Sequence, residues 1–273
     1  MNNNIDRTAL LNIAIRAAVL GGNYLMDNFG SSLISKIKSE TDIQLKSDLV
    51  SAEIICSFIA ERRPDDAIFS EETEKPVTEY LHAKHLWIID PLDGTNNYAI
   101  TIPYFGVSIS FFDNNILSLG VINDPVLRAV YTVTRGNDVT RNDSRIKVSK
   151  QCALKGATIS VVNDYSYEGR SLGYSLEKSI GLICKRIVKT WAPAMDLCRV
   201  AGGSIDGMVC LNGYYLDTCT GLLMVEEAGG VVRDLSGREI SHSSKLLERP
   251  ISFVAASSPE LLEELLSKTA ELF

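Results

Sequence analysis

The chain is organised around the stretch Leu86-Trp87-Ile88-Ile89-Asp90-Pro91-Leu92-Asp93-Gly94-Thr95-Asn96-Asn97-Tyr98-Ala99. Its first four residues are apolar, and so short an apolar run favours a buried strand, which we expect to end at Asp90-Pro91. The carboxylates of Asp90 and Asp93 then flank a turn, and Gly94-Thr95 opens a helix. Carboxylates at a strand end bind a hard cation, and free amides at a helix start bind an oxyanion. The stretch therefore predicts a metal ion held against a phosphate.

Other interpretations of the same aspartates make different demands on the sequence. An EF-hand loop starting at Asp90 would need an oxygen ligand at its third position and Glu at its twelfth, where the chain has Leu92 and Thr101. This excludes an EF-hand. An aspartyl-phosphate enzyme uses a single strand-end Asp as nucleophile, whereas the spacing Asp-x-x-Asp-Gly-Thr favours two carboxylates that share metal ions. Plain turn formation is the ordinary role of Asp-Pro and Asp-Gly, and it stays open here.

The composition of the chain limits the kinds of protein that it can be. The chain has 273 residues, of which 45% are hydrophobic, and this is enough for one large domain or two small ones. A net charge of -7 argues against a partner that is a nucleic acid polymer. The apolar runs are too short or too charged to span a bilayer, and the N-terminus lacks the basic segment of a signal peptide. We therefore expect a cytoplasmic protein with no membrane partner.

The number and spacing of the cysteines and histidines limit which kinds of catalytic site the chain can form. The six cysteines include no Cys-x-x-Cys pair, so in a cytoplasmic chain they are expected to be reduced core residues. The three histidines are His82, His85 and His242, too few and too scattered for a transition-metal centre or a histidine-based triad. The chemistry must therefore rest on carboxylates.

Apolar spacing outside the central stretch alternates between helix and strand periods. Helices are predicted over 5–29 (capped by Asn4 or Asp6), 48–63, 171–186, 192–201 and 217–228, and from Ser258 onward. Strands are predicted over 67–69, 86–89, 106–111, 117–122, 129–133, 157–162 and 206–211. The pattern predicts one compact unit, 1–273, with helices and sheets in layers.

Further acids follow predicted strands or open predicted helices. Glu71-Glu72 comes directly after the strand at 67–69, so its carboxylates could share a sheet edge with Asp90. Asp217 opens a helix, where the ordinary role of an aspartate is an N-cap. An isolated glutamate pair is usually a solvated loop, so the residues alone leave both alternatives open.

The stretch from Trp87 to Tyr98 resembles the first signature of the inositol monophosphatase superfamily, which are magnesium-dependent, lithium-sensitive phosphatases. Ser70-Glu71-Glu72 is similar to the acidic pair that precedes this signature. The segment 215–230 resembles the second signature, with Leu216 where the family has Trp. Lys38 to Asp48 resembles a mobile lid segment, with Leu45 in place of the usual Thr. The resemblance extends from about residue 10 to residue 253.

This resemblance implies a fold, a cofactor and residue roles. The fold would be an α/β (α+β) sandwich of alternating layers, α-β-α-β-α, of the sugar phosphatase type, with lobes at about 1–145 and 146–273. Up to three Mg²⁺ ions per subunit would be held by Glu71, Asp90, Leu92 (through its carbonyl), Asp93 and Asp217. Gly94 and Thr95 would bind phosphate, Thr95 and Glu71 with the help of Asp48 would orient and activate the attacking water, and Lys38 and Asp42 would belong to the lid. The family habit also implies a homodimer.

The same resemblance places a substrate wall and shows where the chain departs from it. The substrate would contact Asp93, Trp191, Ala192, Pro193, Cys210 and Asp217. Cys210 stands where inositol-specific members carry a glutamate, and a thiol is a poor partner for a sugar hydroxyl. Trp191-Ala192-Pro193 replaces the family's Gly-x-Ala, and the indole could stack on a sugar or a base. Core packing is the alternative role for Cys210 and Trp191.

The leading hypothesis is a Mg²⁺-dependent phosphomonoesterase that hydrolyses a small polyol or sugar phosphate by direct attack of water. The alternatives within the family are fructose-1,6-bisphosphatase, 3′,5′-bisphosphate nucleotidase and a phosphatase of a biosynthetic intermediate. An alternative of another class is a non-catalytic homologue that binds metal and phosphate for regulation. The intact set of five ligand positions argues against it, because a binding protein has no need of every carboxylate.

Overall fold

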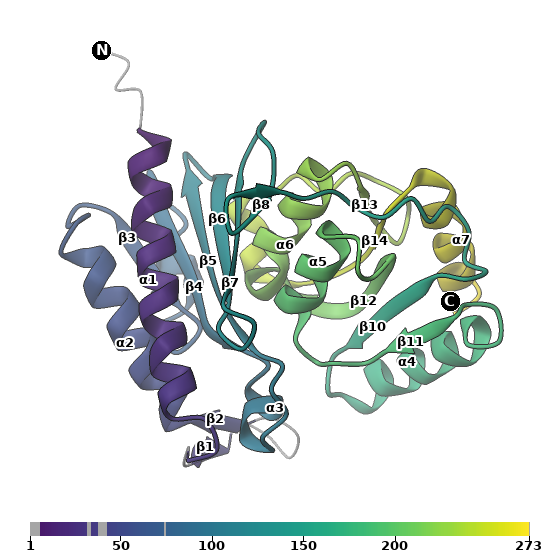
Figure 1. The fold of residues 1–273 in the computed structure, drawn as a ribbon, viewed down its shortest axis with the longest axis horizontal. Helices are drawn as coiled ribbons and strands as arrows, with labels where there is room; N and C mark the ends of the chain where they lie inside the picture. Colours follow the sequence, from purple (N-terminus) through teal and green to yellow (C-terminus); the bar gives the residue numbers. More distant parts are fainter. Residues whose placement is uncertain (1–5, 32–33, 38–42, 74, 273) are drawn as a thin grey trace.

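The computed structural model describes residues 6–31, 34–37, 43–73 and 75–272, so the lid residues Lys38 and Asp42 lie outside it. Figure 1 shows two sheets and three groups of helices stacked in alternating layers. The seven-stranded sheet has the order β3 (Ala67–Ser70), β4 (His85–Asp93), β5 (Gly106–Asp113), β6 (Ile116–Asp124), β7 (Ala129–Thr134), β8 (Thr140–Arg141) and β9 (Ser144–Arg145). The five-stranded sheet has the order β11 (Arg186–Val188), β10 (Thr158–Asn163), β12 (Gly207–Tyr214), β14 (Pro250–Ala256) and β13 (Val231–Asp234).

The helices form an outer layer, a central layer and a second outer layer (Figure 1). One outer layer is α1 (Arg7–Asp27) with α2 (Lys46–Ala60), the central layer is α5 (Pro193–Ala201) with α6 (Tyr215–Glu227), and the other outer layer is α4 (Tyr167–Ile180) with α7 (Pro259–Ala270). Short elements complete the chain: the hairpin β1 (Ile34–Ile37) with β2 (Ile43–Leu45), helix α3 (Thr95–Ala99), and 3-10 turns at Val77–Glu79 and Ser244–Glu248. The α-β-α-β-α order predicted by resemblance is confirmed.

Strand β4 is apolar on both faces because helices cover both. Trp87 and Ile89 belong to the core formed with α1 and α2, whereas Leu86 and Ile88 belong to the core formed with α5 and α6. Successive side chains of a strand point to opposite faces, so a strand between two helical layers reads as a continuous apolar run. This explains why four consecutive apolar residues identified the strand.

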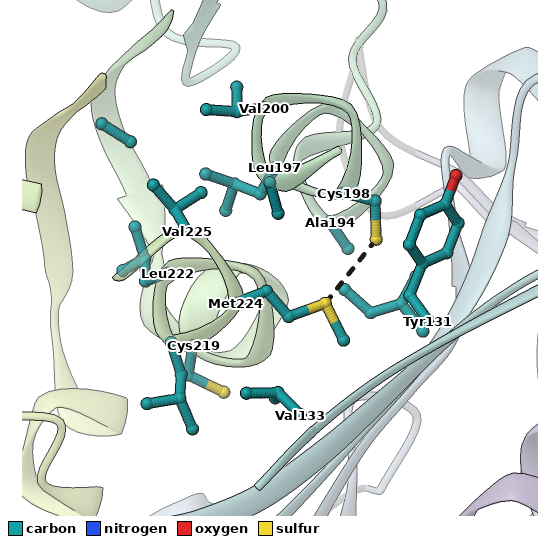
Figure 2. Close-up of a cluster of buried hydrophobic side chains, with 14 of the residues drawn as sticks. Tyr131, Val133, Ala194, Leu197, Cys198, Val200, Cys219, Leu222, Met224 and Val225 are labelled. Carbon is teal, nitrogen blue, oxygen red and sulfur yellow. Dashed lines mark hydrogen bonds between the residues drawn. The ribbon is translucent and has the colours of Figure 1, made fainter. Parts of the chain in front are cut away.

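The central helices pack against both sheets. Figure 2 shows Leu197 and Cys198 of α5 facing Leu222 and Met224 of α6, with Val133 of β7 beside them. A separate core lies on the far side of the five-stranded sheet, where α4 and α7 cover β10, β12 and β14. The central layer therefore joins the two sheets, and α6 carries Asp217 between them.

Helix α1 forms as predicted, with the Asp6 carboxylate accepting hydrogen bonds from the backbone N–H groups of Thr8 and Ala9. By length and composition it could cross a membrane, contrary to the prediction that the apolar runs of the chain are too short or too charged to do so. Its buried residues, among them Leu10, Ala14 and Leu25, pack in the core with β4 to β6. The apolar face of α1 therefore contributes to the hydrophobic core.

Several predicted boundaries are wrong. Strand β4 continues through Pro91 to Asp93 because β5 still pairs with it there, while β3 ends opposite Ile89, so no neighbouring strand needs the missing N–H of Pro91. Helix α4 runs from Tyr167 to Ile180, ahead of the predicted 171–186, because Ser166 caps it and β11 takes up 186–188. Strands β11, β13 and β14 were not predicted.

Candidate active site

Four acidic residues lie together at one end of the seven-stranded sheet. Glu71 follows β3, Asp90 and Asp93 lie at the end of β4, and Asp217 lies in the first turn of α6. Carboxylate oxygens of Glu71, Asp90 and Asp217 all lie within 4.8 Å of one another. Tyr214 occupies the N-cap position of α6, so Asp217 is not the helix cap that its position in the sequence suggested.

Strand pairing explains how these side chains meet. Strands β3 and β4 are parallel and adjacent, and the N–H of Glu71 donates to the carbonyl of Ile89 (3.0 Å). In a regular strand Asp90 and Asp93 would point to opposite faces. The pairing with β5 contains a register shift: Asp90 pairs with Ser108 and Asp93 pairs with Gly106. An interval of three residues on β4 therefore lies opposite an interval of two residues on β5. Such a bulge re-aims side chains, and both aspartates line the same cavity.

Burial and the neighbouring carboxylates disfavour ionisation of Asp90 and Asp93. Burial raises the pKa of Asp90 well above its ordinary value, and the nearby carboxylates of Glu71, Asp217 and Asp93 raise it further. Burial also raises the pKa of Asp93, although its Oδ2 accepts a hydrogen bond from the N–H of Met195 (2.9 Å). An all-oxygen donor set that repels itself is the kind of site that fits a hard divalent cation.

Thr95 and Asp48 form a second pair beside the acids. Thr95 Oγ1 lies 3.1 Å from Asp48 Oδ1 and 3.0 Å from the carbonyl of Leu92, so its single proton can go to either acceptor. Burial raises the pKa of Asp48 to about 7, and the charges of Glu72 and Glu71 contribute, while a hydrogen bond from the N–H of Leu45 opposes the shift. A hydroxyl held by a carboxylate can orient a water molecule at the edge of the acid cluster.

Gly94 is required by its backbone. Its φ is +89°, and a Cβ placed there would lie 3.0 Å from the carbonyl oxygen of Tyr104 and 3.1 Å from Cβ of Ala192. We expect Gly94→Ala to lower the free energy of unfolding by roughly 1–3 kcal/mol, because a left-handed backbone and a tight contact both oppose a side chain. If Gly94 also holds phosphate, activity should fall by more than the loss of folded protein accounts for. Thermal denaturation and a phosphate-release assay on the same variant would measure the two effects. An unchanged melting temperature would contradict this.

A cavity of about 510 Å³ opens in front of the acids. It is lined by these residues proposed from the sequence: Glu71, Asp90, Leu92, Asp93, Gly94, Thr95, Trp191, Pro193, Cys210 and Asp217. Of the proposed residues that the structure describes, two do not line it. Asp48 lies behind Thr95, and Ala192 is fully buried beneath Gly94, so Ala192 belongs to the packing and not to the substrate wall.

Other residues of the cavity were missed. They are Asn96, Val162, Asn163, Asp164, Tyr165, Ser166, Asn212, Gly213, Tyr214 and Pro250. Many of these follow β10 or end β12, the adjacent parallel strands of the second sheet. The signal for them is the rule that ligands bind at the carboxyl ends of strands, because 157–162 and 206–211 are also predicted strands.

Known proteins resemble this chain over nearly its whole length. The inositol monophosphatase family model matches residues 6–272. The chain is 30% identical to the Nus factor SuhB of Pasteurella multocida over 95% of each chain, and 31% identical to the inositol-1-monophosphatase of Mesorhizobium japonicum over 85% of this chain and 87% of that relative. The solved structure of an IMPase from Thermotoga maritima superposes with a TM-score of 0.84 at 26% identity, covering 97% of this chain and 98% of that one. This chain, with its carboxylate cluster at the end of β3 and β4, therefore belongs to the inositol monophosphatase family.

Proposed function

We propose that the protein is a Mg²⁺-dependent phosphomonoesterase that transfers the phosphoryl group of a small ester directly to water. The observation that carries the proposal is the convergence of the Glu71, Asp90 and Asp217 oxygens within 4.8 Å of one another, at the head of a cavity that Gly94 and Thr95 also line. A cavity of about 510 Å³ suits a small molecule. Membership of a phosphatase family supports the reaction class.

We propose which residues would hold the metal, three of which, Glu71, Asp90 and Asp217, converge in the structure. Carboxylates of Glu71, Asp90, Asp93 and Asp217 and the carbonyl of Leu92 would hold up to three Mg²⁺. The Leu92 carbonyl lies 3.0 Å from Thr95 Oγ1, and its second lone pair can serve a cation. When bound, Mg²⁺ neutralises phosphate charge and lowers the pKa of water.

The chain's own groups would orient the nucleophile. When the Thr95 hydroxyl donates to Asp48, its oxygen lone pairs can accept a hydrogen bond from water at the phosphate. Glu71 would accept the proton that this water loses as the new O–P bond forms. The ester O–P bond would break in line with it, and the departing alkoxide would take a proton from solvent. Asp48 would keep the hydroxyl in place without touching the phosphate, so it is a positioning residue.

The alcohol would be a polyol or sugar. The named activity of the Mesorhizobium relative, inositol-1-monophosphatase, supports this class. Fructose 1,6-bisphosphate, a nucleoside 3′,5′-bisphosphate and a biosynthetic phosphate ester are the alternatives within the same family. We also propose a homodimer, which sedimentation equilibrium would test.

A panel of esters tests the proposal. We expect Mg²⁺-dependent phosphate release from at least one of inositol 1-phosphate, fructose 1,6-bisphosphate, adenosine 3′,5′-bisphosphate, histidinol phosphate and the glycerol phosphates. Turnover should stop when EDTA removes Mg²⁺, because the acid cluster cannot neutralise phosphate by itself, and Li⁺ should inhibit if it replaces one Mg²⁺. Failure to bind Mg²⁺ in a calorimetric titration would refute the metal site itself.

The name of the Pasteurella relative, a Nus factor, favours a second candidate function. In that case the site would bind metal and phosphate for regulation, without turnover. The same experiments separate the two functions. Mg²⁺ binding together with no phosphate release from any ester would favour the regulatory role.

A further inference from the structure

Trp191 is held in a backbone conformation that suits glycine. Its φ is +56°, a region that bulky residues rarely adopt. The peptide before it is fixed on two sides: the carbonyl of Thr190 accepts from Asn97 Nδ2 (2.7 Å), and Thr190 Oγ1 donates to the buried Asp196 (2.6 Å). Strain that the surroundings enforce in this way tends to occur at functional positions. The question is what the indole does there.

The Trp191 indole stacks on the ring of Tyr165. The ring centroids are 4.6 Å apart and the planes differ by 15°. The Tyr165 hydroxyl accepts a hydrogen bond from Asn96 Nδ2 (2.8 Å), which ties it across the cavity to α3. Both rings line the cavity that contains the acids. We call Tyr165 and Trp191 together the aromatic wall.

Polar side chains beside the aromatic wall are engaged within the protein. Asn163 Nδ2 donates to the carbonyl of Asp164 (2.7 Å), and Asp164 Oδ1 accepts from both the N–H and the hydroxyl of Ser166 (2.8 and 2.5 Å). Ser166 Oγ in turn accepts from the N–H of Gly169 as the cap of α4 (2.9 Å). One exception is Asn163 Oδ1, which is buried and has no hydrogen-bond partner among the described residues, so it is left to accept from a ligand hydroxyl. The other groups named here are already engaged and are poorly placed to replace the water that the hydroxyls of a bound polyol would lose.

Apolar residues also line the cavity, beside the polar Asn212 and Tyr214. They are Val162, Pro193, Cys210 and Pro250. A hydroxyl buried against such a surface without a partner carries a desolvation cost, whereas a flat ring gains contact area and stacking. Both effects favour a ligand with a flat ring over a ligand with many hydroxyls.

We propose that the aromatic wall is a specificity determinant that selects, among small phosphate esters, those whose alcohol carries a planar aromatic or heteroaromatic ring over bare polyol rings. The proposal rests on the proposed function, because that function places the phosphoryl group at Gly94 and Thr95 and directs the alcohol towards the wall. It departs from the polyol or sugar alcohol that the name of the Mesorhizobium relative supports, and it leaves the chemistry of the acids unchanged.

Two phosphonates that cannot be hydrolysed test the wall without turnover. Benzylphosphonate and cyclohexylmethylphosphonate have the same size and charge and differ in the planarity of the ring. With Mg²⁺ present, calorimetry should show benzylphosphonate binding roughly threefold to tenfold more tightly. It should also change the tryptophan fluorescence, because Trp191 is one of only two tryptophans and the other, Trp87, is fully buried in the core. Inorganic phosphate, which lacks a ring, should leave the fluorescence unchanged.

Trp191→Gly is the decisive variant, because glycine suits a φ of +56° and the chain should fold normally. We expect it to remove both the fluorescence change and the difference between the phosphonates. Tyr167→Ala is the matched control, since Tyr167 is an exposed aromatic residue (81% exposed) near the wall that does not line the cavity. It should behave as the wild type does.

Equal binding of the two phosphonates, or a difference that survives Trp191→Gly, would overturn the proposal. So would a wild-type kcat/KM that is higher for inositol 1-phosphate than for benzyl phosphate. These outcomes are distinct from failure of the proposed function, in which no ester is hydrolysed although the phosphonates still bind.

Discussion

Replacing Asp93 by asparagine is expected to lower kcat/KM by more than about a thousandfold, a loss of about 4 kcal/mol of transition-state stabilisation, while the fold stays intact. Asparagine has nearly the same shape as aspartate, and its carbonyl oxygen can still accept the hydrogen bond from the N–H of Met195. What it removes is a buried negative charge in the proposed metal site. Phosphate release and the Mg²⁺ dissociation constant of the variant would measure the two effects separately.

Stability distinguishes this result from simple misfolding. Burial raises the pKa of Asp93, which means that the charged form is disfavoured without a cation. We therefore expect the metal-free variant to melt at the same temperature as the metal-free wild type or above it, and Mg²⁺ to stabilise the variant less. Asp65→Asn, at an exposed position outside the cavity, is the matched control and should change neither quantity. A variant with full turnover would show that Asp93 is not needed by the metal.

Most helices and strands could be predicted from apolar periodicity, whereas the order of the layers was predicted from the family resemblance. The run Leu86 to Ile89 is apolar on both faces, and both faces are covered by helices. Helices α5 and α7 are found where a proline at the first turn marks them. Amphipathic spacing gives a helix face only to within a residue or two, and the apolar Leu49 of α2 is accordingly 37% exposed.

The site was only partly predictable, since it depends on contacts between distant segments. Asp90 and Asp93 were identified as partners, but the bulge that turns both towards one cavity is a property of the pairing with β5. Trp191 was singled out in the sequence, whereas its stacking on Tyr165 requires β10 and α5 to be placed side by side. Likewise, the burial that raises the pKa of Asp48 to about 7 arises from the packing around α2. No local pattern encodes such contacts.

Stability of the metal-free protein should fall as pH rises from about 4 to about 8. Asp48, Asp90 and Asp93 have raised pKa values, so the folded protein holds their protons to a higher pH than the unfolded chain does. Where the folded state binds more protons, the free energy of unfolding decreases with pH. The loss begins above the ordinary carboxyl value of 3.8 and is complete for Asp48 above its pKa of about 7. For this one buried group it amounts to at most about 4 kcal/mol, at 1.36 kcal/mol for each pH unit.

Mg²⁺ should reverse this trend, because the cation binds the ionised carboxylates and competes with their protons. Melting temperatures measured from pH 5 to pH 8.5 would therefore diverge, falling in EDTA and staying level or rising in saturating Mg²⁺. Asp48→Asn should flatten the EDTA curve, since its neutral amide does not titrate. A melting temperature in EDTA that rises over the same range would mean that the acids are ionised in the folded protein at pH 5. The repulsion between Glu71, Asp90 and Asp217 would then be balanced by the protein itself, and the proposed need for a cation would fail.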